Sequence, residues 1–206
     1  MIRRIALPFA LALVASFALG QVPTPDEFLG YPLGERFTPH HRILEYFDEL
    51  ARRSPLITIE KFGETYEGRP LVLATITSAK NRAALDSIRA NVAALARGES
   101  PDLAKSTPAI VWLAFGVHGN ESSSAEAAML VASTLLRDAD SSRLLDDAVV
   151  LIDPLQNPDG RERYISWFHR TRGVKANPNP DGFEHREPWP GGRTNHYLID
   201  MNRDWA

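Results

Sequence analysis

A continuous apolar run that ends in a glycine turn constrains this chain more than any other feature of its sequence. The run extends from Ala109 to Phe115, and the turn that follows reads Gly-Val-His-Gly-Asn-Glu over residues 116–121. An apolar run of this length predicts a strand that is buried on both faces of a sheet. Ligands of open α/β sheets gather at the carboxyl ends of the strands. The sequence therefore places His118 and Glu121 at a candidate site.

An imidazole and a carboxylate three residues apart can ligate one zinc ion. The chain has no cysteine, so a metal site must use histidine and carboxylate side chains. The same absence excludes disulfides and a thiol nucleophile. The formal net charge is −3, which gives no basic field for nucleic acid, and we expect no nucleic-acid partner.

The elements around the run predict an α/β domain. Segments 56–62 and 71–76 are β-rich and flank a glycine-containing connection, which is typical of a hairpin. Apolar spacing predicts a helix over 81–97. A second apolar strand at 148–152 follows the first after a helical segment, and together they predict a β-α-β unit.

Local signals also predict where other elements begin. Thr38 followed by proline predicts a helix with Thr38 as its N-cap. Ser123 and Glu126 have the spacing of a capping box. Asn157-Pro-Asp-Gly160 is typical of a turn, and residues 197–201 resemble a short strand.

The first twenty residues predict a secretory signal peptide. Two arginines precede an apolar stretch from Ile5 to Phe17, and small residues at 18–20 offer a cleavage site. An uncleaved anchor is the alternative, but the stretch is shorter than a span of ~20 apolar residues. We expect cleavage near Gly20–Gln21, a secreted or periplasmic protein, and no stable membrane anchor afterwards.

Four motifs occur in an order that resembles a known family. They are the hairpin Gly63-x-Thr-x-Glu-Gly-Arg-Pro70, the pair His118-x-x-Glu121, the segment Asn157-Pro-Asp-Gly160 and the run Asp200-x-Asn-Arg203. Their order and approximate spacing resemble the zinc carboxypeptidases of the carboxypeptidase A family, peptidase family M14. The resemblance covers residues 38–206, which we predict to be an incomplete zinc carboxypeptidase domain. A signal peptide (1–20) and an irregular segment (21–37) precede it.

The resemblance implies an α/β fold, with a mixed, mostly parallel sheet and helices on both faces, truncated at the C-terminus. It implies that His118 and Glu121 are two of three protein ligands of one Zn²⁺. It also implies that Asn202 and Arg203 bind the free C-terminal carboxylate of a peptide, which suits the bidentate guanidinium fork. The implied activity is hydrolysis of C-terminal peptide bonds of peptide or protein substrates, by an enzyme that we expect to be monomeric.

The chain departs from the family pattern at two places. In the family, the residue directly before the glutamate of the His-x-x-Glu pair is often an arginine, and in this chain it is Asn120. The family's oxyanion-stabilising arginine follows the third motif, and the matching region here is 167–172. The alignment puts His169 at that position with Arg170 beside it, so we assign the role to Arg170, with Arg172 as the alternative.

Two further roles stay open. In the family the third zinc ligand, a histidine, and the general-base glutamate lie beyond the Asn-Arg pair, and this chain stops at Ala206. We therefore expect both outside the chain, since His196 precedes Asn202 and does not match. Asp153 could orient a zinc-ligating histidine, or it could bind only backbone groups at the end of its strand.

Two alternative functions are also compatible with the motifs. Aspartoacylases share the string His-Gly-Asn-Glu, which suggests a zinc-dependent deacylase of N-acyl amino acids. The other alternative is a non-catalytic exported peptide-binding module that kept the carboxylate pocket. The hairpin and Asn-Pro-Asp-Gly motifs favour the peptidase over the deacylase.

Overall fold

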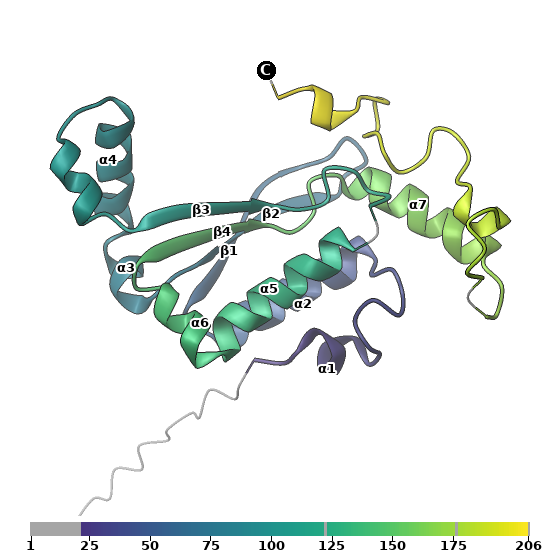
Figure 1. The fold of residues 1–206 in the computed structure, drawn as a ribbon, viewed down its shortest axis with the longest axis horizontal. Coiled ribbons are helices and arrows are strands. Elements are labelled where there is room, and N and C mark those ends of the chain that lie inside the picture. Colours follow the sequence, from purple (N-terminus) through teal and green to yellow (C-terminus); the bar gives the residue numbers. More distant parts are fainter. Residues whose placement is uncertain (1–21, 122, 176, 206) are drawn as a thin grey trace, which may run out of the picture.

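A four-stranded sheet in the order β1-β2-β4-β3 organises the computed structural model, which describes residues 22–121, 123–175 and 177–205 (Figure 1). The predicted signal peptide lies outside the described residues. The strands are β1 (Ile57–Glu64), β2 (Pro70–Ile76), β3 (Ala109–Ala114) and β4 (Ala148–Asp153). The helices are α1 (Pro25–Leu29), α2 (His40–Arg53), α3 (Ala79–Ala83), α4 (Leu85–Ala96), α5 (Ser124–Arg137), α6 (Ala139–Leu144) and α7 (Pro158–Thr171), with short 3₁₀ helices η1 (Pro101–Lys105), η2 (Phe183–His185) and η3 (Met201–Arg203).

The sheet is mixed, as the family resemblance implies. β3 and β4 are parallel and are linked through α5 and α6, which confirms the β-α-β unit, and β1 and β2 form the predicted hairpin. β2 also pairs with β4 in antiparallel fashion. The expectation of a mostly parallel sheet is therefore wrong for the described chain. A short connection such as that between β1 and β2 allows only antiparallel pairing, because parallel neighbours need a long crossover.

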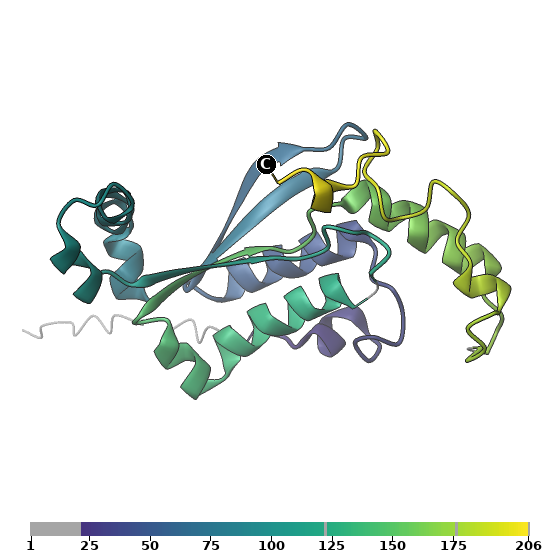
Figure 2. The ribbon, with the colours of Figure 1, turned by 45° about the horizontal axis from the view of Figure 1, so that its top comes forward.

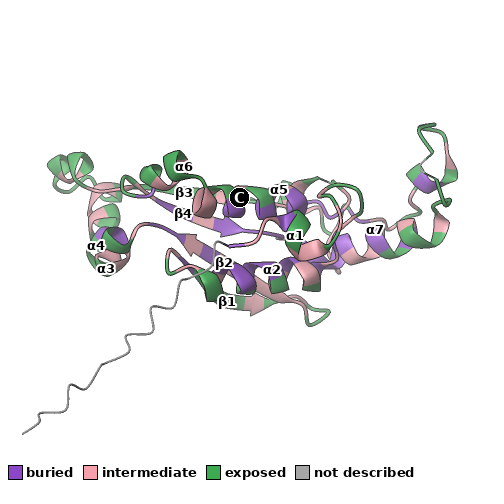
Figure 3. Ribbon diagram, turned by 90° about the horizontal axis from the view of Figure 1, so that it is seen from below, coloured by how far each residue is buried: buried purple, intermediate pink, exposed green. Residues whose placement is uncertain are grey.

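One face of the sheet carries the hydrophobic core. Helices α2 and α5 lie side by side across this face, and the buried residues concentrate between them and the strands (Figures 2 and 3). The core combines alternate residues of β2 and β4 with the apolar stripes of the two helices, which is the two-layer arrangement expected of an α/β domain. Its central members are Ala74, Ile76, Val150, Ile152, Ile43, Phe47, Leu50 and Met129.

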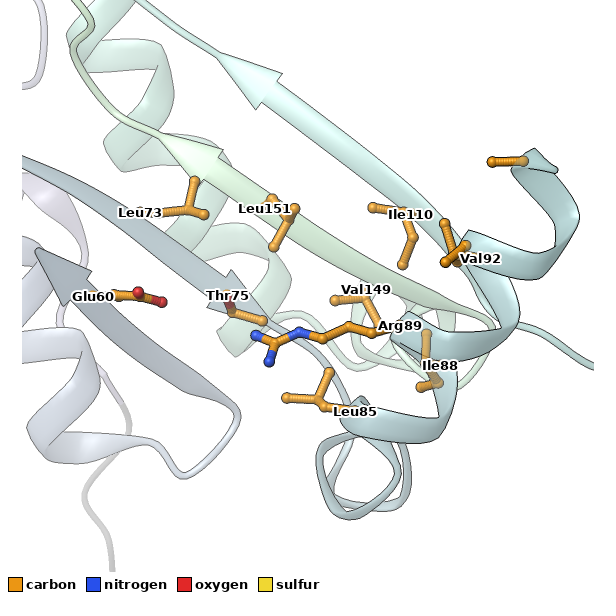
Figure 4. A pocket seen from close by; sticks show the side chains of 12 residues that line it. Glu60, Leu73, Thr75, Leu85, Ile88, Arg89, Val92, Ile110, Val149 and Leu151 are labelled. Carbon is orange, nitrogen blue, oxygen red and sulfur yellow. The ribbon is translucent and has the colours of Figure 1, made fainter. Parts of the chain in front are cut away.

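On the opposite face, among the residues that the structure describes, α4 covers one end of the sheet. A cavity of about 370 Å³ lies between α4 and the strands, with apolar side chains on both walls (Figure 4). Strand β3 is largely exposed, and Trp112 is 60% exposed. The prediction that the run Ala109–Phe115 is buried on both faces is thus wrong for the described residues. Among them, β3 is an edge strand with β4 as its one neighbour.

Tertiary contacts replace two of the predicted helix caps. Thr38 does not cap α2, and its backbone N–H donates instead to Glu126 Oε1 at 2.7 Å. Ser123 makes no capping hydrogen bond with its side chain. Glu126 is buried and pairs with Arg161 of α7 at 2.6 Å, so it links α5 to α7 and to the segment that leads into α2. The predicted helix over 81–97 is divided at Ala84 into α3 and α4.

Within the described part of the chain, we find no helix whose length and apolar character would suffice to cross a membrane.

Candidate metal centre

A tight turn after β3 presents the predicted ligands. Gly116 has a φ of +64°, which a residue with a side chain rarely adopts, and a Cβ atom there would meet Leu155 Cδ1 at 2.4 Å. The Gly116 N–H donates to Ser124 Oγ at 2.7 Å. The turn is therefore held between the start of α5 and the segment after β4, and it directs His118 inward.

His118 lies between two carboxylates. Its side chain is buried, its Nδ1 is 2.9 Å from Glu121 Oε1, and its Nε2 is 2.8 Å from Asp200 Oδ1. An ionised carboxylate only accepts hydrogen bonds, and a neutral imidazole carries a single N–H. If Nε2 donates to Asp200, the Nδ1 lone pair faces Glu121 and suits a bound cation.

The donor set fits zinc. Tetrahedral zinc with Zn–N and Zn–O distances near 2.1 Å would hold the imidazole nitrogen and carboxylate oxygen about 3.4 Å apart. The observed Nδ1–Oε1 distance is 2.9 Å. The Glu121 side chain is 61% exposed, so it is free to open by the remaining half ångström. No group of three or more His, Cys, Asp or Glu side chains that could hold a metal occurs among the described residues.

The second carboxylate beside His118 is that of Asp200, a contact that the sequence did not predict. It accepts hydrogen bonds from His118, from Arg193 at 2.9–3.0 Å and from the Asn202 backbone N–H at 3.1 Å. The hydrogen bond from His118, together with those from Asn202 and Arg193, lowers the pKa of Asp200. The general preference of metal-ligating histidines for a carboxylate partner was the available signal, and the partner is Asp200 rather than Asp153.

Asn202 and Arg203 lie in η3, directly after Asp200. Both are exposed; Asn202 Oδ1 accepts from Trp205 Nε1 at 3.0 Å, and Arg203 Nη1 donates to the Asn202 carbonyl at 2.9 Å. The predicted short strand at 197–201 is absent from this described segment. A turn replaces it, in which Leu198 has a φ of +63°.

The structure does not bring Arg170 to this group. Arg170 is exposed in the last turn of α7, where its Nε donates to the Ser166 carbonyl at 3.1 Å. The His118 loop contacts the first turn of α7 at Gly160, and ten helical residues span about 15 Å. The guanidinium that does reach the group is that of Arg193, with Nη1 3.4 Å from His118 Nδ1.

The β1–β2 hairpin is bound to the start of α7, which gives the first and third motifs a joint structural role. Thr65 Oγ1 and Arg69 Nη1 both donate to Asp159 Oδ1, at 2.8 and 2.6 Å. Asn157 caps α7 by accepting from the Gly160 N–H, so the predicted turn is a helix start. His196 contacts Glu67 of the hairpin at 3.1 Å rather than Glu121.

The comparisons with known proteins agree with the motif pattern. The sequence profile of the zinc carboxypeptidase family, Peptidase_M14, matches residues 43–206. No curated protein matches the chain significantly in sequence.

Solved carboxypeptidases are among the similar structures. Carboxypeptidase A from Helicoverpa armigera is 21% identical with a TM-score of 0.47, over 61% of this chain and 25% of its own. The metallo-carboxypeptidase from Burkholderia cenocepacia is 20% identical with a TM-score of 0.45, over 81% of this chain and 31% of its own. The chain thus spans less than a third of the length of these two proteins.

Proposed function

Because the chain belongs to the zinc carboxypeptidase family, we propose that it acts in zinc-dependent hydrolysis of C-terminal peptide bonds. The observation that carries the proposal is the placement of His118, with one ring nitrogen against Asp200 and the other against Glu121. Asn202 and Arg203 lie in η3, the short helix that Asp200 caps, so the proposed carboxylate-binding pair is close in sequence to the residue that contacts His118.

His118 and Glu121 would hold the metal. Bound zinc would supply a Lewis acid and lower the pKa of a water molecule. Asp200 would keep the proton on His118 Nε2, which leaves Nδ1 as the ligand atom. Catalytic zinc sites commonly have three protein ligands, and His118 and Glu121 would supply two of them.

The remaining roles concern the substrate. Arg203 would donate two parallel hydrogen bonds to the free C-terminal carboxylate of a peptide, and Asn202 would add a neutral amide donor. Arg193 would be a better candidate than Arg170 for polarising the scissile carbonyl, because its guanidinium lies beside His118. We further propose that the protein is exported to the periplasm or the medium, because two arginines precede an apolar stretch at its N-terminus.

A paired-substrate assay tests the proposed activity. A peptide with a free C-terminus should be hydrolysed, the same peptide with a C-terminal amide should not, and a zinc chelator should abolish turnover. Turnover of N-acyl amino acids without peptide hydrolysis would favour the deacylase. Peptide binding without turnover in a zinc-loaded sample would favour the binding module, and either result would overturn the proposal.

A further inference from the structure

Three glycines from three separate segments meet beside His118. Gly119 follows it in the loop after β3, Gly160 lies in the first turn of α7, and Gly192 lies in the segment that leads to Asp200. The Gly119 N–H donates to the Gly192 carbonyl oxygen at 2.8 Å. These segments therefore contact each other backbone to backbone.

None of the three positions has room for a side chain. A Cβ atom at Gly119 would lie 2.1 Å from the Arg161 nitrogen, and one at Gly160 would lie 2.3 Å from the Gly192 oxygen. A Cβ atom at Gly192 would lie 2.7 Å from the Gly160 oxygen. Because these obstacles are backbone atoms, no rotation of a side chain relieves them. The φ angles of the three glycines lie outside the left-handed region, so glycine is needed here for space.

Asn157 binds the same three segments through its side chain. It is 2% exposed, and its Oδ1 accepts from the Gly160 N–H at 2.9 Å. Its Nδ2 donates to the carbonyl oxygens of Val117 at 3.4 Å and Arg193 at 3.3 Å. Val117 precedes His118, and Arg193 follows Gly192. The buried amide of Asn157 thus links three segments: the loop that carries His118, the first turn of α7, and the segment that leads to Asp200.

We infer that this junction of Gly119, Gly160, Gly192 and Asn157 positions the imidazole of His118 against Asp200. The two partners are 82 residues apart in sequence. Within the described residues after α7, only the short 3₁₀ helices η2 and η3 are regular structure, so contacts with the rest of the domain must hold this segment in place. The junction residues are positioning residues, because they act on the metal ligand through backbone contacts.

The substitution Gly192→Ala in the full chain tests the inference, which rests on the proposed function for the identity of the metal. Zinc affinity is measured by competition with a chromophoric chelator, and the Nε2–H proton of His118 is followed by NMR. We expect zinc affinity to fall 10–100-fold, as for other disruptions of a ligand's orienting partners. The Nε2–H signal should also be lost or exchange faster with solvent.

Two glycines provide matched controls. A Cβ atom at Gly63 meets no atom within 4 Å, and one at Gly173 meets none closer than 3.4 Å. Neither glycine has a φ in the left-handed region. Gly63→Ala and Gly173→Ala should therefore keep zinc affinity within about two-fold of the wild type and retain the NMR signal.

A second variant keeps the inference testable if Gly192→Ala does not fold. Asn157→Asp has nearly the same shape and keeps the acceptor for the Gly160 N–H, but it loses the donors to Val117 and Arg193. It should weaken zinc binding and perturb the His118 signal in the same direction. Wild-type zinc affinity and an unchanged signal in Asn157→Asp would overturn the inference. If the wild type itself binds no zinc, the proposed function fails, and the NMR signal alone decides the role of the junction.

Discussion

Asp153 offers a quantitative test of how the end of β4 is built. It is 4% exposed, and its Oδ1 has no hydrogen-bond partner in the described structure. Burial raises its pKa from 3.8 to about 6, although the Leu155 backbone N–H and the Gln156 side chain oppose this shift. Replacement by asparagine removes the charge and nearly preserves the shape. We therefore predict that Asp153→Asn stabilises the protein at neutral pH.

The size of this effect follows from proton linkage. Below pH 3.8 the carboxyl is protonated in both the folded and the unfolded state and contributes nothing. As the pH rises from 3.8 to about 6, the unfolded state loses its proton while the folded state retains it, so the free energy of unfolding falls. Each pH unit between these two pKa values lowers the free energy of unfolding by about 1.4 kcal/mol. The total cost above pH 6 is therefore at most about 3 kcal/mol.

Urea unfolding at a series of pH values between 4 and 8 measures the effect. Asp153→Asn should raise the free energy of unfolding by about 1–3 kcal/mol at neutral pH and by almost nothing near pH 4. Asp102→Asn is the control, because the Asp102 side chain is 94% exposed, and it should change stability little at any pH. A stability difference between Asp153→Asn and the wild type that does not depend on pH would refute the reasoning.

The other predictions concern the buried ion pair and the candidate site. Glu126→Ala removes the carboxylate that Arg161 contacts at 2.6 Å, and urea unfolding should show a loss of about 3–5 kcal/mol; a loss below about 1 kcal/mol would contradict this role. Asp200→Asn should weaken zinc binding about 10–100-fold in a chelator competition, and an unchanged affinity would show that Asp200 does not orient His118. Arg203→Ala should lower kcat/KM for peptides with a free C-terminus by about 10–100-fold, since a charge-assisted hydrogen bond contributes about 1.5–3 kcal/mol; an equal loss of binding for C-terminally amidated peptides would argue against carboxylate recognition.

The parts of the fold that depend on local sequence were predictable. The β1–β2 hairpin and the parallel pairing of β3 with β4 follow from apolar runs and connection lengths. Features that depend on distant partners were not. Glu126 has the spacing of a capping box, yet it is drawn into an ion pair with Arg161, 35 residues away. The apolar pattern of β3 predicts burial on both faces, but it does not identify the segments that would pack against those faces.

The same limit applies to the candidate site. His118 and Glu121 could be identified because they lie three positions apart in one loop, so their proximity follows from the sequence alone. Asp200 could be found only as part of a motif, since its hydrogen bond to His118 joins positions 82 residues apart. Arg170 was chosen by alignment, but it lies in the last turn of α7 and donates to the Ser166 carbonyl, whereas Arg193 Nη1 lies 3.4 Å from His118 Nδ1.

A crystal structure with bound zinc, with anomalous diffraction recorded at the zinc edge, tests the central claim most directly. The account predicts an anomalous peak about 2.0–2.2 Å from both His118 Nδ1 and a carboxylate oxygen of Glu121, while His118 Nε2 remains hydrogen-bonded to Asp200. A zinc ion on Nε2 with Asp200 displaced, or a zinc site that involves neither His118 nor Glu121, would contradict it.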